Sequence, residues 1–464
     1  MTFIIDESQP LVVRPIICEK NTKTIEKEVA VDTTVVVDEG TTKSSNIQAF
    51  VNTIKANIGS GILVMPYAFK NSGTILGLVT LIVVASITLH CTVLLIKCKN
   101  RLKRQNENEQ IKTYGDVGKA SLGRFGAVLI EILLIFTQFG FSCAYLIFIG
   151  TNVHEMVPKL QEWHAVAISV VILIPLCLVR NLKYLSPFSL ISELCIIAGL
   201  IIVIYYDIHS MVTEPFPGHR GIKAFDIQNF PIFFGICIYG FEGIGLALPI
   251  EESMKDRASY PKVFYTAGTM ISIIMAIFGM LGYLAFGAGV RDIITLNLPQ
   301  GSVLSYIIKI GFIVALLFTY PIQLIPVSEL FDNYLQSIIK FVKSRQNKSQ
   351  VSPSVNDDQF AGGVKVAPKL SYVLGIVIRI VLVILTALLA VSIPAFGDFL
   401  TLIGGLGGTM LAFILPSVIH LVTFRGNLRF WIIFKDVLII LFGVSAVVVT
   451  TLQSGQHLID VLSK

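Results

Sequence analysis

Long apolar runs constrain this 464-residue chain more than any other feature of its sequence. Hydrophobic residues make up 54% of it and charged residues only 14%, whereas soluble domains carry roughly 25% charged residues. The apolar residues gather into runs of about twenty with few charges among them, which is the length that spans a bilayer as a helix. We therefore expect an all-α integral membrane protein and exclude a soluble multidomain protein.

The hydropathy pattern predicts about eleven transmembrane helices. Residues 1–45 mix Thr, Val, Glu and Lys without a helical period, and we expect a disordered cytosolic tail there. Residues 46–455 form the predicted transmembrane domain, and residues 456–464 form a short extracytosolic tail. The polar stretch 341–369 is interpreted as a flexible cytosolic linker, and a short amphipathic helix is expected within the loop 99–122. The predicted spans run near residues 50–70, 75–97, 124–152, 163–181, 186–207, 227–250, 263–287, 302–327, 370–392, 397–422 and 430–453.

Basic residues recur on alternate loops between these spans. The positive-inside rule makes such loops cytoplasmic, so the N-terminus is predicted to be cytosolic. Binding of nucleic acid is excluded, because it needs a basic face on a folded soluble domain. The clusters are Lys97, Lys99, Arg101, Lys103 and Arg104; Arg180 and Lys183; Lys340, Lys343, Arg345 and Lys348; Arg425 and Arg429.

Two of the expected spans are interrupted by glycine-rich strings. Glycine weakens a membrane helix and lets the backbone open. Opened backbone must line a protected cavity or bind something, because hydrocarbon offers no hydrogen-bond partners. Two such breaks in corresponding halves of a chain indicate the substrate site of a secondary transporter for a small zwitterionic or charged solute. The strings are Asn57-Ile58-Gly59-Ser60-Gly61-Ile62 and Tyr239-Gly240-Phe241-Glu242-Gly243-Ile244-Gly245.

The first break falls near the bilayer midplane, because a half-helix from residue 50 to Gly59 is about 15 Å long. Past it, unpaired N–H groups carry partial positive charge and suit a carboxylate, to which the Ser60 hydroxyl adds a hydrogen bond. Carbonyl groups near Ile238–Phe241 in the second break suit an ammonium group. The alternative is a packing interface of small residues.

The predicted substrate-binding residues come from both breaks and from the eighth span. Tyr239 and Phe241 are candidates to close over a ligand, although bundle packing is the commoner fate of an aromatic residue. Tyr320 and Gln323 flank Pro321 and are expected to line the cavity from the eighth span. The full set is Asn57, Ile58, Gly59, Ser60, Gly61, Tyr239, Phe241, Gly243, Tyr320 and Gln323.

Glu242 is the acidic residue of the second break. A carboxylate near the midplane costs about 2.5–3.5 kcal/mol on insertion scales, so it should face a cavity and have a partner. Burial favours its neutral form, so we interpret Glu242 as a proton carrier with Lys55 of the first span as its countercharge. The alternative is a fixed link between Glu242 and Lys55 or the backbone that holds the bundle together.

The other polar residues inside the spans are interpreted as structural. They are Glu131 and Gln138 in the third span, Glu193 in the fifth and His420 near the inner end of the tenth, where an interfacial position is expected. Four glycines of the tenth span are expected to allow close packing and hinge motion. These are Gly404, Gly405, Gly407 and Gly408.

Motifs for catalysis, metals and nucleotides are absent from the sequence. The seven cysteines show no CxxC or Cys/His spacing, so neither a metal site nor an external disulfide framework is predicted. No Walker A string occurs, which argues against drive by ATP. No constellation such as HExxH or GxSxG occurs, so we expect neither an enzyme nor a bound cofactor.

Four strings, in order along residues 45–455, resemble the proton-assisted amino acid transporters of the amino acid/auxin permease group. The resemblance implies an eleven-span, leucine-transporter-like fold, a 5+5 inverted repeat plus one extra helix. It also implies small neutral amino acids as cargo, with protons as possible co-substrate. Asn52 stands where family members often carry a histidine tied to proton coupling, and the family's external cysteine pair is missing. The strings are Ile54-Lys55-Ala56-Asn57-Ile58-Gly59-Ser60-Gly61-Ile62-Leu63 with Pro66 and Ala68-Phe69-Lys70-Asn71-Ser72-Gly73; Phe241-Glu242-Gly243-Ile244-Gly245 with Leu248-Pro249-Ile250-Glu251; Gly282-Tyr283-Leu284-Ala285-Phe286-Gly287 with Ile294-Thr295-Leu296-Asn297-Leu298-Pro299; and Tyr320-Pro321-Ile322-Gln323.

Two functions remain open at this point. The leading hypothesis is a multi-pass secondary transporter of small neutral amino acids that works by alternating access, in the plasma membrane or the late endosomal or lysosomal membrane. The second is an amino acid sensor that binds its ligand and signals with little flux. An ion channel is disfavoured because no filter-forming string occurs.

Overall fold

The computed structural model describes residues 43–105, 110–179, 182–213, 221–349, 368–393 and 395–462. Within these ranges every regular element is a helix, and the only strand-like pairing is an isolated bridge between Ser44 and Met254. The prediction of an all-α membrane fold is therefore confirmed. The predicted N-terminal tail lies outside the described residues except for its last three positions, 43–45.

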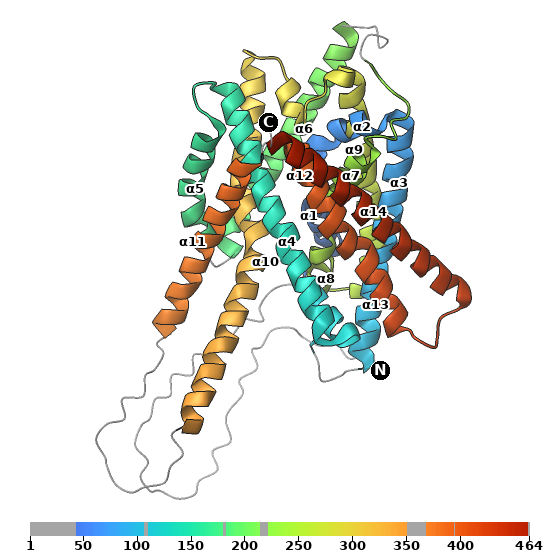
Figure 1. Cartoon of the computed structure of the whole chain (residues 1–464), viewed down its shortest axis with the longest axis vertical. Coiled ribbons are helices and arrows are strands. Elements are labelled where there is room, and N and C mark those ends of the chain that lie inside the picture. The colour runs from blue at the N-terminus through green and yellow to red at the C-terminus, as the bar shows by residue number, and fades with distance from the viewer. Residues whose placement is uncertain are drawn as a thin grey trace, which may run out of the picture. The chain divides into compact units, whose positions relative to one another are not determined.

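Nine helical elements of the described chain are long and apolar enough to cross a membrane (Figure 1). The apolar helix α5 (Glu162–Leu178) is shorter, with 17 residues. The first predicted span is divided into α1 (Asn46–Asn57), a 3-10 helix (Ser60–Val64) and α2 (Met65–Ser72). The predicted count of eleven requires α5 and this divided element to cross as well, and it stays a prediction. The nine are α3 (Thr74–Gln105), α4 (Tyr114–Met156), α6 (Leu182–Thr213), α7 with α8 (Phe230–Gly240 and Ile244–Ser253), α9 (Tyr260–Phe286), α10 (Val303–Ser349), α11 (Pro368–Ser392), α12 with α13 (Phe396–Leu402 and Leu415–Thr423) and α14 (Phe430–Leu462).

Local sequence signals explain where several helices begin. Ser45 accepts a hydrogen bond from the Gln48 backbone while the Gln48 side chain accepts one from the Ser45 backbone, which is a capping box at the start of α1. Thr113 caps α4 in the same way. Gly123 has a φ of 73° and turns the chain after the first turns of α4, so the short helix expected in the loop 99–122 is present.

One predicted boundary was wrong. Helix α10 continues to Ser349, although a flexible linker was expected from residue 341. No glycine or proline follows Pro326 within α10, so nothing in its sequence stops the helix earlier. Helix α14 extends to Leu462, so most of the predicted C-terminal tail is helical; the candidate membrane span within it ends at His457, and the extracytosolic position of the tail stays a prediction. The rest of the predicted linker, residues 350–367, lies outside the described residues.

The divided helices lie at the centre of the bundle, between α3 on one side and α5 with α11 on the other (Figure 1). Helix α2 packs against α7 and α9, and α1 packs against α8 and α9. The stretch between α12 and α13 includes a π-helical segment, Ile403–Gly408, that packs against α7 and α4. A Cβ at Gly404 would lie 2.1 Å from the Gly235 carbonyl oxygen, so glycine is required for this approach. The expectation of close packing at these glycines is confirmed.

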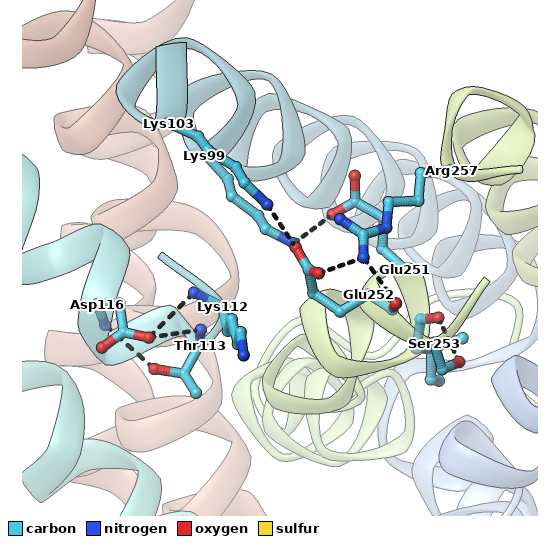
Figure 2. A network of polar contacts seen from close by, with 10 residues as sticks. Lys99, Lys103, Lys112, Thr113, Asp116, Glu251, Glu252, Ser253 and Arg257 are labelled. Atoms are coloured by element: carbon cyan, nitrogen blue, oxygen red, sulfur yellow. Dashed lines mark hydrogen bonds and ion pairs between the residues drawn. The ribbon is translucent and has the colours of Figure 1, made fainter. Parts of the chain in front are cut away.

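Basic side chains gather where α3 and α8 end, and we call this the basic end of the bundle. There the Lys99 Nζ lies 2.9 Å from Glu251 Oε2 and 2.7 Å from Glu252 Oε1 (Figure 2). Lys99 and Glu251 are both fully buried, whereas Lys103 and Arg257 border Glu252 from the exposed side. The network ties the end of α3 to the end of α8.

Candidate functional site

The first predicted break is present in the structure. Helix α1 ends at Asn57, and Ile58 and Gly59 are extended, with φ/ψ of −88°/97° and −134°/−150°. The chain then resumes as the 3-10 helix from Ser60, which has no side-chain cap. Its first N–H groups are therefore left without the partners that a continuous helix provides. They are the groups that the sequence predicts to bind a carboxylate, and that role stays a prediction.

The second break is also present. Helix α7 ends at Gly240, α8 begins at Ile244, and the φ/ψ values of Phe241 (−99°/9°) and Gly243 (−130°/5°) are not helical. The Glu242 N–H donates to the Tyr239 carbonyl at 3.3 Å, and the Phe241 N–H donates to the Ile238 carbonyl at 3.0 Å. Each of these carbonyl oxygens keeps a second lone pair for a further donor.

The two breaks meet each other. The Ser60 Oγ and the Tyr239 hydroxyl are 2.8 Å apart and hydrogen-bonded. A Cβ on Gly61 would lie 2.9 Å from the Gly240 Cα, so glycine lets the two backbones touch at this point. Residues that are 179 positions apart in the sequence thus form one site.

A small cavity of about 20 Å³ lies at this meeting point, and we call it the central cavity. That volume holds roughly one water molecule. The Phe141 and Tyr239 rings pack over it with centroids 4.7 Å apart, and the Gln323 Nε2 donates to the Tyr145 hydroxyl at 3.2 Å. The lining residues are Ala56, Asn57, Gly59, Ser60, Gly61, Phe141, Tyr145, Tyr239, Gly240, Glu242 and Gln323.

Six of the predicted substrate-binding residues line the central cavity: Asn57, Gly59, Ser60, Gly61, Tyr239 and Gln323. Ile58, Phe241 and Gly243 belong to the breaks but lie outside this lining. Tyr320 does not line the central cavity as predicted: its buried hydroxyl hydrogen-bonds Thr386 Oγ1 of α11. A position along a helix does not fix the direction of its side chain, and Tyr320 faces the neighbouring helix instead.

Phe141 and Tyr145 of α4 are site residues that were not predicted from the sequence. Both line the central cavity, and neither is near a glycine break. They are four residues apart, and Gln138 precedes Phe141 by three, so all three share one helix face. An aromatic and polar face in an otherwise apolar span is the signal that would have found them.

Glu242 lies in the central cavity, as expected for a functional carboxylate. Its Oε2 is buried and has no hydrogen-bond partner among the described residues. A Cβ on Gly408 would lie 2.7 Å from this oxygen, so the carboxyl group occupies space that the glycine leaves open. The expected partner Lys55 makes no ion pair with Glu242 in the described chain; it lines a different cavity.

That second cavity, which we call the basic-end cavity, has a volume of about 350 Å³. It adjoins the central cavity, because Ala56 and Gln323 line both. Lys55 of α1 and Glu193 of α6 are its charged residues. The other lining residues are Asn52, Gln138, Leu246, Pro249, Ile250, Ser253, Thr319, Ile322 and Pro326.

Three further expectations concern cysteines, metals and His420. The six cysteines of the described residues are free, and no cluster of potential metal ligands occurs among those residues. His420 was expected at the membrane interface, but it is buried, and its Nδ1 lies 2.6 Å from the Asp436 Oδ2 of α14. An acidic residue on the adjoining helix holds it inside the bundle.

The chain is similar to several known proteins. The family model described as transmembrane amino acid transporter protein matches residues 42–455. Amino acid transporter ANT1 of Arabidopsis thaliana is 32% identical over 408 residues, covering 87% of this chain and 90% of that protein. Vacuolar amino acid transporter 4 of Saccharomyces cerevisiae is 28% identical, covering 90% of this chain and 58% of that protein. The crystal structure of MhsT in complex with L-phenylalanine has 13% identity and a TM-score of 0.49, covering 89% of this chain and 99% of that chain.

Proposed function

This chain belongs to the transmembrane amino acid transporter family, and we propose that it carries small neutral amino acids across a membrane by alternating access. One observation carries the proposal: two helices open at the same point, and residues of both breaks line one cavity. Opened backbone at this depth is stable only where it lines a protected site.

A free amino acid suits the chemistry of the central cavity. Its carboxylate fits the N–H groups that begin the 3-10 helix at Ser60, and its ammonium group fits the carbonyls at the end of α7. The hydrogen bond between Ser60 and Tyr239 satisfies these hydroxyls while no ligand is bound, and an entering ligand would replace it. The glycine contacts and the ring of Phe141 leave little space, which favours a small side chain.

Alternating access is supported by cavities on both sides of the central cavity. The basic-end cavity has a volume of about 350 Å³, and a further cavity of about 410 Å³, lined by Lys70, Arg291 and Asp292 among others, lies at the Lys70 end of α2. The central cavity has only about 20 Å³. The positive-inside rule assigns the basic end to the cytosol, so we infer that transport connects the central cavity first with one of these cavities and then with the other.

Glu242 is the proposed proton carrier. Its Oε2 is buried and has no partner among the described residues, and the side chain borders the proposed ligand site. A carboxyl group in that setting binds a proton readily, and a ligand next to it is sensitive to its charge. Glu242→Gln keeps the shape and removes the titration, so we expect uptake that no longer depends on pH while amino acid binding is retained. An unchanged pH profile in this variant would exclude Glu242 from the coupling.

Reconstituted uptake tests the whole proposal. The purified chain in proteoliposomes should show saturable uptake of glycine, alanine, serine or proline, and an inward proton gradient should raise it. Binding without flux would favour the alternative function of a sensor. The yeast relative is named a vacuolar transporter, which supports an acidic organelle over the plasma membrane. Imaging of the full chain with a fluorescent tag distinguishes the two locations.

A further inference from the structure

The basic-end cavity is lined by two side chains of opposite charge, Lys55 and Glu193. No ion pair or side-chain hydrogen bond between them occurs among the described residues. Lys55 comes from the last turn of α1, and Glu193 comes from α6, so the two groups reach this cavity from different helices.

A third polar group in the same cavity lacks a partner. Gln138 of α4 is 8% exposed, and its Oε1 is buried without a hydrogen-bond partner in the described part of the chain. Leaving a buried polar atom unpaired costs free energy, and a bound ligand can remove that cost. The cavity therefore offers a cationic group, an anionic group and an amide acceptor at once.

These three groups select the class of ligand. A simple anion would be attracted by Lys55 but repelled by Glu193. A simple cation would be attracted by Glu193 but repelled by Lys55. A zwitterion satisfies both, with its carboxylate toward Lys55 and its ammonium group toward Glu193 and the Gln138 oxygen. The volume of about 350 Å³ is large enough for a free amino acid with its water molecules.

We propose that the basic-end cavity is a second amino acid site, which a substrate occupies on its way between the central cavity and the cytosol. Ala56 and Gln323 line both cavities, so the two sites are adjacent. The inference rests on the proposed transport of small neutral amino acids and adds a location that the helix breaks alone do not indicate.

Counting bound ligand tests the second site. Equilibrium dialysis of the purified full chain with labelled alanine should reach two molecules per chain. Lys55→Met and Glu193→Gln should each weaken one of these sites about tenfold or more, as expected for loss of a charged hydrogen-bond partner. Glu131→Gln is the matched control, because Glu131 is a glutamate of α4 that bonds Tyr334 and lines neither cavity. It should leave both sites unchanged.

Two alanine analogues assign each charge to its partner. Ethylamine lacks the carboxylate, so Lys55→Met should not weaken its binding. Propionate lacks the ammonium group, so Glu193→Gln should not weaken its binding. If both variants weaken both analogues equally, the two residues act on the structure of the cavity rather than on the ligand, and the proposal fails.

The outcomes separate this inference from the proposed function. One alanine per chain, lost in Gly61→Ala but unaffected by Lys55→Met and Glu193→Gln, would overturn the second site and leave the transport proposal standing. No bound alanine in any form of the chain would overturn both. Two molecules per chain with one site sensitive to Gly61→Ala and the other to Lys55→Met would support both.

Discussion

Lys99 is the side chain whose replacement tests the buried network in Figure 2 most directly. Its Nζ lies 2.9 Å from Glu251 Oε2, and both side chains are 1% exposed. Lys99→Met keeps most of the length and removes the charge, which leaves the Glu251 carboxylate buried and unpaired. Breaking a buried ion pair from one side costs about 3–5 kcal/mol. Glu252 suffers less, because Arg257 lies 2.7 Å from its other oxygen.

The comparison variant is Lys103→Met. Lys103 is 45% exposed and 3.5 Å from Glu252, so its loss should cost at most about 1 kcal/mol. Heating the full chain in detergent and measuring the folded fraction by gel filtration should show a much lower midpoint for Lys99→Met than for Lys103→Met. Adding Glu251→Gln to Lys99→Met should recover part of the loss, because no unpaired charge remains. Equal midpoints for the two lysine variants would refute the reasoning.

Three further predictions follow from local geometry. Gly61→Ala should lower uptake at least about tenfold without loss of the folded chain, because the new Cβ would lie 2.9 Å from the backbone of the second break. Burial raises the pKa of Asp226, but Lys223 at 2.8 Å outweighs it and leaves that pKa below its ordinary value. The stabilisation is therefore present above pH of about 4 and is lost as the pH falls through the folded-state pKa, so Asp226→Asn should flatten the acid side of a melting-temperature profile. A disulfide between cysteines at Ser44 and Ser253, whose hydroxyls are 3.0 Å apart, should leave uptake intact although Ser253 lines the basic-end cavity, because backbone hydrogen bonds already join the two segments and we expect them to move together; loss of uptake on oxidation would contradict this.

The sequence identifies the membrane helices and their breaks because both depend on composition over short stretches. An apolar run of about twenty residues has few alternatives to a membrane helix. The helices are interrupted around Gly59 and Gly240 because glycine destabilises a continuous helix. The end of α10 was predicted too early, because polar residues after position 341 do not by themselves end a helix that lacks glycine and proline.

The site is harder to predict, because it depends on the rotation of each helix and on which helices become neighbours. Glu242 was predicted because it lies within a break. Its predicted link to Lys55 is absent from the described chain, because the rotation of α1 about its axis places Lys55 in the lining of the other cavity, and the sequence does not specify that rotation. Lys55 instead lines the basic-end cavity with Glu193, which comes from the undivided helix α6. The breaks thus locate the backbone groups that we propose for a ligand, whereas Glu193 on its proposed path comes from a helix that the glycine strings do not mark. A prediction of such a path from sequence must therefore consider the polar residues on one face of each undivided helix as well as the glycine breaks.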